Sequence, residues 1–98
     1  MDEIAYKYET LCSFKSVSRS MYLYYNAECQ RLSSLIMELK NVPYHFFEPI
    51  ALANYLNRYT KELEVAMCKR QRYLNHFLAA DNAIQNLCPY NYLQEIFN

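Results

Sequence analysis

Four side chains stand out as candidate catalytic acids or bases: two histidines and two glutamates that lie close together in the sequence. His45 and His76 lie far apart in the sequence, and neither has a nucleophile beside it. Glu62 and Glu64 are two positions apart, which places them on different faces of a helix rather than in a carboxylate pair. A cysteine–histidine pair could still form in space, since such partners need not be neighbours in sequence. We nevertheless expect no catalytic residues and predict that the chain is not an enzyme.

Four cysteines could bind a metal ion, but their spacing does not favour it. They are Cys12, Cys29, Cys68 and Cys88. No two of them form a Cys-x-x-Cys pair, an arrangement found in many structural zinc sites. Cys29 instead falls in a periodic row of apolar residues, where cysteine packs as a small hydrophobic side chain and stays reduced in a cytosolic protein. The sequence therefore predicts no metal ligands and no cofactor.

Phosphate and nucleic-acid recognition also find little support. The chain contains no glycine, so it has neither a glycine-rich phosphate-binding loop nor a Gly-x-Ser-x-Gly nucleophile elbow. Ten basic and ten acidic side chains give a formal net charge of zero, whereas nucleic-acid binding needs a net basic face. One dense basic cluster consists of Lys69, Arg70 and Arg72. It is a candidate contact for an acidic surface such as a microtubule or nucleic acid, or else a solvated helix face with Arg70 extending from the seam.

Apolar residues recur at alternating steps of four and three through the first part of the chain. This is the spacing of an amphipathic helix with a seam close to a heptad repeat, and we predict a helix over about residues 3–40. Lys15 and Ser18 interrupt the seam, and serines between residues 13 and 20 lower the helix propensity, which leaves a break open there. The expected interface residues of this helix are Leu11, Tyr22, Tyr25, Leu32, Ile36 and Leu39.

The same apolar spacing returns in a second helix, predicted over about residues 49–80. Pro49 suits its first position, where the missing N–H would have no partner within the helix. The expected interface residues of this helix are Leu52, Leu56, Tyr59, Leu63, Tyr73 and Phe77.

We expect the second helix to end near residues 80–82 and a loop with a short helix to follow over 81–98. In a chain without glycine, Asn82 and Asn41 are the residues best able to take the left-handed conformation that caps many helices. The chain stops one residue after the apolar pair Ile96-Phe97. We expect either that this end docks onto a partner or that the sequence belongs to a longer chain.

Residues 41–49 form the corner between the two helices. Its two prolines cannot continue a helix, because proline lacks a backbone donor and clashes with the preceding turn. His45, Phe46 and Phe47 either plug the end of a helical hairpin or form a hot spot for a partner, and the two roles are compatible. If the corner reverses the chain, residues 1–98 form a single all-α unit, a long antiparallel helical hairpin or coiled coil with a short C-terminal helical segment.

The composition places the chain among folded, interacting proteins. It is 53% hydrophobic, which excludes a disordered polar tail, and its 11 tyrosines and 5 phenylalanines suit half-buried interface positions. No run approaches the roughly 20 apolar residues of a membrane span. The acidic start Met1-Asp2-Glu3 lacks the apolar core of a signal peptide, so we expect a cytosolic or nuclear location.

The corner and the second helix also resemble a known family. His45-Phe46-Phe47 follows an apolar helix end, and Leu63-Glu64 precedes the basic, leucine-containing run Lys69–Leu74. Asn86-Leu87-Cys88-Pro89 then resembles an Asn-Leu-Pro element with one residue inserted. In this order and approximate spacing, residues 42–87 resemble the second subunit of the augmin (HAUS) complex.

The resemblance implies a non-enzymatic subunit of an assembly that binds spindle microtubules and recruits γ-tubulin ring complexes. The expected partners are then other long-helix subunits, with microtubules contacted indirectly and the spindle cytoskeleton as the location. No small molecule, membrane or nucleic acid is expected. The residue pattern alone leaves open a self-contained small helical binding module or homodimer, as in a viral or accessory protein.

Overall fold

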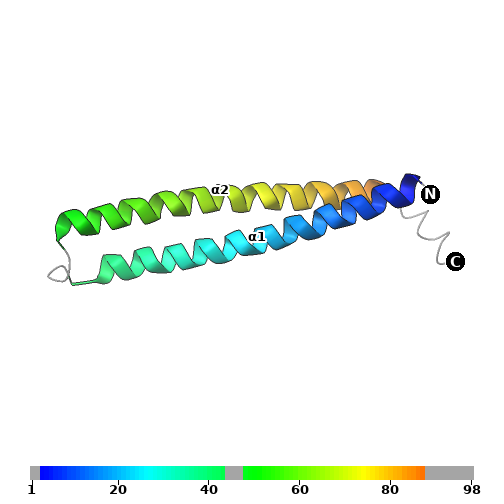
Figure 1. The fold of residues 1–98 in the computed structure, drawn as a ribbon. Helices are drawn as coiled ribbons and strands as arrows, with labels where there is room; N and C mark the ends of the chain where they lie inside the picture. The colour runs from blue at the N-terminus through cyan, green and yellow to red at the C-terminus, as the bar shows by residue number, and fades with distance from the viewer. Residues whose placement is uncertain (1–2, 44–47, 88–98) are drawn as a thin grey trace. The chain divides into compact units, whose positions relative to one another are not determined.

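The described part of the protein consists of two α-helices of equal length. The computed structural model describes residues 3–43 and 48–87, in which α1 spans Glu3–Asn41 and α2 spans Pro49–Leu87, each with 39 residues (Figure 1). No strand occurs in these two stretches, which confirms the predicted all-α helical hairpin. The expected short C-terminal helix lies outside the described residues. Neither α1 nor α2 contains, among its described residues, a stretch long and apolar enough to cross a membrane.

α1 runs without interruption through residues 13–20, where the serines left a break open. Its first turns are supported locally, because Lys7 pairs with Glu3 at 3.1 Å and Thr10 Oγ1 donates to the Tyr6 carbonyl at 2.9 Å. Glu3 also places a negative charge at the positive end of the helix dipole. Packing against a second helix stabilises helices more than propensity does, which explains why the serines do not end α1.

α1 ends at Asn41 without the left-handed cap that the sequence suggested. The Val42 N–H donates to the carbonyl of Leu39, three residues earlier, at 3.4 Å, and this bond tightens the last turn. Pro43 follows and cannot extend the ladder of hydrogen bonds. No residue in the described part of the chain has a positive φ, so neither Asn41 nor Asn82 acts as the predicted cap.

α2 begins at Pro49, as predicted. Glu48 precedes it, and its carbonyl accepts the N–H of Leu52 at 3.0 Å, which is the first helical hydrogen bond. Proline costs nothing at this position, because its missing donor would have no partner within the helix. The three aromatic corner residues of the prediction, His45, Phe46 and Phe47, lie outside the described residues.

The predicted end of α2 near residues 80–82 is wrong, because the helix continues to Leu87. Ala80 is buried at 2% exposure, so this turn is held by packing. Asp81 accepts a hydrogen bond at 3.1 Å from Gln85, one turn further along the helix. Both features favour continuation over the left-handed turn that Asn82 could have adopted.

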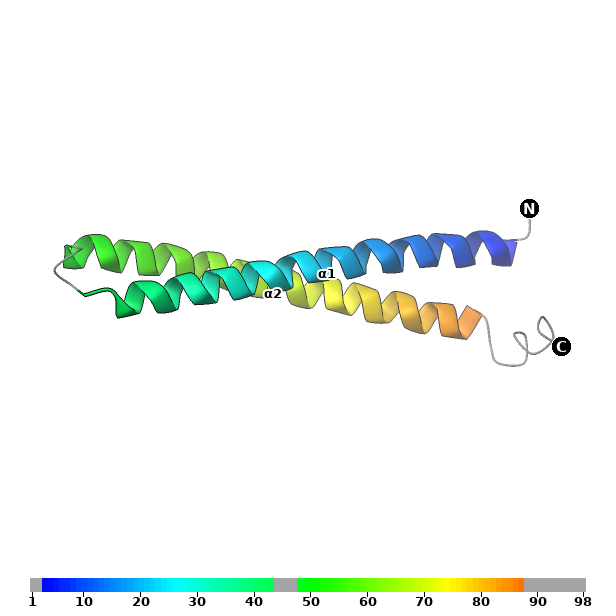
Figure 2. The ribbon, with the colours of Figure 1, turned by 90° about the horizontal axis from the view of Figure 1, so that it is seen from below.

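The contacts of the hairpin group into two compact units, and each unit holds a segment of both helices. Unit 1 comprises Met1–Met21 and Arg72–Asn98, and unit 2 comprises Tyr22–Gln71. Within each unit the α1 and α2 segments lie side by side (Figure 2). In each unit, the earlier residues of the α1 segment contact the later residues of the α2 segment, so the paired segments are antiparallel.

Candidate interaction surface

The seam of unit 2 is built from small and large apolar side chains in alternation. Cys29, Leu32 and Ala66 form its buried core, with exposed fractions of 4%, 2% and 6%. Three half-buried side chains pack against this core: Tyr25, Tyr59 and Leu63. The small Cys29 and Ala66 are almost completely buried, which requires the two helix backbones to approach closely at this point. The seam is therefore short and tight rather than a broad core.

None of the twelve apolar residues predicted as interface positions is exposed in the structure. Leu32 is buried. Eleven are half-buried: Leu11, Tyr22, Tyr25, Ile36, Leu39, Leu52, Leu56, Tyr59, Leu63, Tyr73 and Phe77. The core of unit 2 brings four of the twelve together, namely Tyr25, Leu32, Tyr59 and Leu63. This part of the two stripes meets within the chain, so it forms the hairpin's own seam.

Lys15 and Ser18, the polar residues that interrupt the stripe of α1, are accommodated within unit 1. Lys15 Nζ lies 2.7 Å from Asp81 Oδ1 of α2 and 5.3 Å from the centre of the Phe77 ring. Ser18 is 2% exposed, and no buried side-chain nitrogen or oxygen of the described chain lacks a hydrogen-bond partner. The interruption is therefore a cross-helix ion pair beside a buried serine.

His76 belongs to an aromatic cluster that joins the two helices of unit 1. Its ring centre lies 5.6 Å from that of Phe14 on α1 and 5.7 Å from that of Tyr73 on α2. His45 lies outside the described residues. No group of three or more metal-ligating side chains occurs in residues 3–43 and 48–87. His76 thus packs among aromatic rings within the described residues.

The cysteines differ in their accessibility. Cys29 is buried in the core of unit 2, Cys12 is half-buried and Cys68 is exposed, and all three are free thiols. Cys88 lies outside the described residues. The position of Cys29 explains its place in the apolar row, because it packs there as a small hydrophobic side chain.

The basic cluster does not form one solvated patch. Lys69 Nζ lies 5.4 Å from the centre of the Tyr25 ring, and Arg70 Nη1 donates to Asn26 Oδ1 at 3.3 Å. These two cations therefore contact α1 within unit 2, while Arg72 is exposed. Lys69 and Arg70 line different grooves of unit 2, so the two side chains lie on different sides of α2.

A large share of the apolar side chains remains exposed outside the seam. Among residues 3–43 and 48–87, four apolar residues are buried, whereas thirteen large ones are exposed at 42–75%. They are Ile4, Tyr6, Tyr8, Phe14, Val17, Leu23, Tyr24, Met37, Ile50, Tyr55, Val65, Met67 and Leu78. These side chains are spread along both helices and leave apolar surface that a partner could cover.

In unit 2 this exposed surface includes an open groove of about 450 Å³. Tyr24 and Val65, exposed at 57% and 54%, form its apolar walls, and Leu32 and Ala66 form its floor. Glu28, Lys61, Glu62 and Lys69 add charges of both signs. The groove can therefore bind an amphipathic surface that carries both apolar and charged groups.

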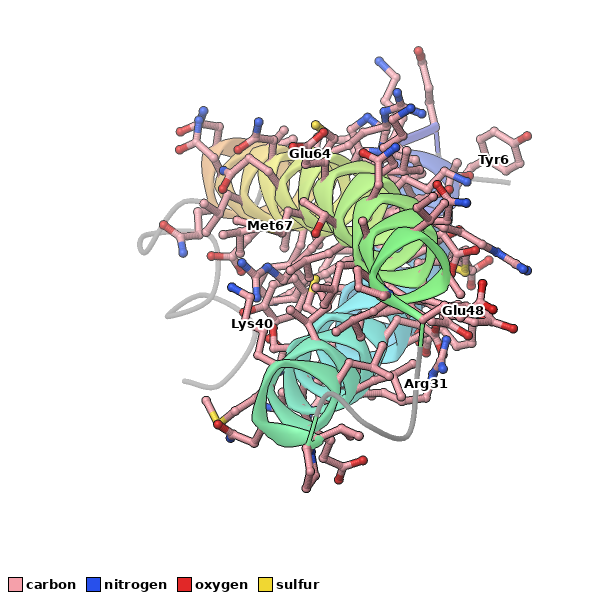
Figure 3. All side chains as sticks on the ribbon, turned by 90° about the vertical axis from the view of Figure 1, so that its left-hand side faces the viewer. Tyr6, Arg31, Lys40, Glu48, Glu64 and Met67 are labelled. Carbon is pink, nitrogen blue, oxygen red and sulfur yellow. The ribbon has the colours of Figure 1, made fainter. Side chains whose placement is uncertain are left out.

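Arg31 adds to the charge pattern beside this groove. Its Nη2 donates to Glu28 Oε2 at 2.9 Å, and this hydrogen bond lowers the pKa of the Glu28 carboxyl. The same hydrogen bond raises the pKa of Arg31, to which the charge of the nearby Glu62 contributes. Figure 3 shows Arg31 and Met67 on opposite sides of the helix pair.

Met67 belongs to a second groove of unit 2, of about 360 Å³. Its lining includes Ser33, Ser34 and Arg70. The two sides of unit 2 thus differ, one with tyrosine and alternating charges and the other with serines and a methionine.

Tyr24, Glu28, Arg31 and Val65 were not among the predicted site residues. Their signal was present in the sequence, because Tyr24, Glu28 and Arg31 recur at steps of four and three beside the seam of α1.

Comparison with known proteins finds no family model, no curated protein and no solved structure that matches this chain.

Proposed function

We propose that the protein is a non-enzymatic coiled-coil scaffold that binds other long helices of a multi-protein complex. The observation that carries this proposal is the imbalance between seam and surface. The seam buries few apolar side chains, and thirteen large ones remain exposed along both helices. Fully burying a large apolar side chain contributes roughly 1.5–3 kcal/mol. These side chains are already partly buried, so covering each one would contribute a fraction of that, and a partner helix that covers several would still stabilise the hairpin.

The charge distribution supports a protein partner over nucleic acid. Formal net charge is zero, and two cations of the basic cluster, Lys69 and Arg70, already contact groups of α1. Alternating charges beside apolar side chains are the usual flanks of a coiled-coil seam.

As a more specific proposal, the complex is augmin, and the chain acts in microtubule-dependent microtubule nucleation at the spindle. Its support is the resemblance of residues 42–87 to the second augmin subunit. The basic residues Lys69, Arg70 and Arg72 belong to the matched motifs. The two-helix architecture is compatible with a subunit of a long-helix complex.

The test is affinity isolation of the tagged full chain from its native source, with identification of the proteins that co-purify. Val17 is 61% exposed, and Val17→Asp should reduce the recovery of partner chains by placing a charge on the apolar surface. Ser16→Asp, at an exposed position one residue earlier, is the matched control and should leave recovery unchanged. Recovery of augmin subunits is the expected result. Long-helix partners without augmin subunits would refute the specific proposal, and no helical partner at all would refute the scaffold.

A further inference from the structure

The groove side of unit 2 carries a pattern of charges that is complementary to itself. We call it the mixed-charge face and define it by Tyr24, Glu28 and Arg31 of α1 and by Glu62, Val65 and Lys69 of α2. Tyr24 and Val65 are more than half exposed, so its apolar part is uncovered in the single chain. The side-chain exposures of Arg31, Glu28 and Glu62 are 57%, 29% and 44%, which leaves all three accessible to a partner.

The charges of this face alternate both along and across the helix pair. Lys69 lies beside the Tyr25 ring and lines the groove together with Glu28, which is one turn further along α1. Arg31 follows Glu28 by three residues and has Glu62 of α2 nearby. At the level of Glu28 and Lys69, α1 therefore carries the acid and α2 the base. At the level of Arg31 and Glu62, α1 carries the base and α2 the acid, although Lys61 also lines the groove there and Arg58 Nε lies 3.3 Å from Glu62 Oε1.

We propose that the mixed-charge face binds a second copy of this chain, so that two hairpins form a symmetric four-helix bundle. A two-fold axis parallel to the helices keeps each level in place and sets α1 of one copy against α2 of the other. Glu28 then faces Lys69 of the second copy, and Arg31 faces Glu62 of the second copy. The symmetry repeats both pairs, so four ion pairs surround the apolar centre formed by Tyr24 and Val65.

A second copy fits this face better than a partner with charge of one sign. An acidic partner would oppose Glu28 and Glu62, and a basic partner would oppose Arg31 and Lys69. Like charges in contact disfavour association and select against such partners. A second copy satisfies both signs at once, and it also covers the tyrosine and valine that form the groove walls. The inference rests on the proposed function in one respect, namely that exposed faces of this hairpin bind helices.

Charge reversal tests the pairing across the two-fold axis. Sedimentation velocity of the full chain over a range of concentrations should show a dimer of twice 11.8 kDa. Glu28→Lys and Lys69→Glu should each weaken the dimer by roughly tenfold to a hundredfold, because two attractive pairs become repulsive. An equimolar mixture of the two variants should restore a heterodimer, since each introduced charge then faces an opposite one. This rescue separates a contact between copies from a simple loss of folding.

Two apolar positions of α2 provide matched variants on opposite sides of unit 2. Val65→Lys should abolish the dimer at concentrations where the unaltered chain is dimeric, whereas Met67→Lys should leave it intact. Both side chains are close to half exposed, at 54% and 46%, so both variants should retain their helical circular dichroism. Loss of the dimer with Met67→Lys alone would overturn the proposal, as would a mixture of charge-reversed variants that stays monomeric.

The outcomes also separate this inference from the proposed scaffold function. A chain that sediments as a monomer at every concentration but still recovers long-helix partners would overturn the dimer and leave the scaffold standing. A dimer that follows the charge-reversal pattern but recovers no other protein would support the dimer and refute the scaffold.

Discussion

Truncation of Leu32 measures how much of the hairpin's stability depends on its short seam. Leu32 is 2% exposed, so Leu32→Ala removes a side chain that has lost its contact with water. Leucine-to-alanine changes in protein cores cost about 2–5 kcal/mol, and the size depends on how far the surroundings collapse into the space. Two helices without a third layer can move together readily. We therefore expect a loss in the lower half of that range, about 2–3 kcal/mol.

The assay is urea unfolding followed by circular dichroism, at a fixed protein concentration because association adds to apparent stability. In thermal unfolding the same loss should lower the Tm by about 10–20 °C for a chain of this size. Leu23→Ala is the matched control, since Leu23 is also on α1 of unit 2 but is 49% exposed. Its expected cost is below about 1 kcal/mol. Equal costs for the two variants would refute the seam, because they would show that the described burial of Leu32 does not stabilise the fold.

Three further predictions concern the ion pairs and thiols. Lys15→Ala and Asp81→Ala should show a coupling energy of about 0.2–1 kcal/mol in a double-mutant cycle, because the pair is about one-third exposed; additive costs would contradict the contact. Cys68 should react with a thiol reagent in the folded protein, whereas Cys29 should react at a rate set by opening of the seam, and equal rates would contradict their different burial. The hydrogen bond from Arg31 lowers the pKa of Glu28 in the folded state. The contribution of this pair to the free energy of unfolding is therefore present above the pKa of Glu28 in the unfolded chain and is lost as the pH falls through its pKa in the folded chain. Unfolding curves should show this loss below the ordinary glutamate pKa, and Glu28→Gln should remove it; an unchanged acid dependence would contradict the pair.

The helix type and the seam could be predicted from the sequence because both depend on local spacing. The steps of four and three put Leu32 and Leu63 on inward faces, and the structure packs them in the same cluster. Pro49 was predicted correctly as the first residue of α2 because its preference is a property of one position in a helix. Such signals need no knowledge of what the other helix does.

The end of α2 could not be predicted in the same way, because it depends on cross-helix contacts. Asp81 and Asn82 are ordinary helix-ending residues when read alone. In the folded chain Asp81 accepts a hydrogen bond from Lys15, a residue distant in sequence, and the adjacent Ala80 is buried. These tertiary contacts outweigh the local preference and carry the helix to Leu87.

The polar residues of the α1 stripe show how the pairing of the helices is specified. A heptad-like row of apolar residues can slide against its partner by one repeat and still bury the same kinds of side chain. Lys15 allows one alignment within unit 1, because in that alignment its ammonium reaches Asp81 and lies over the Phe77 ring. If the helices slipped by one repeat, the half-buried ammonium of Lys15 would lose both Asp81 and the Phe77 ring. This loss costs more free energy than a lost apolar contact. Lys15 therefore weakens the seam slightly and favours one register, and a fixed register gives the exposed residues of unit 1 defined positions relative to one another.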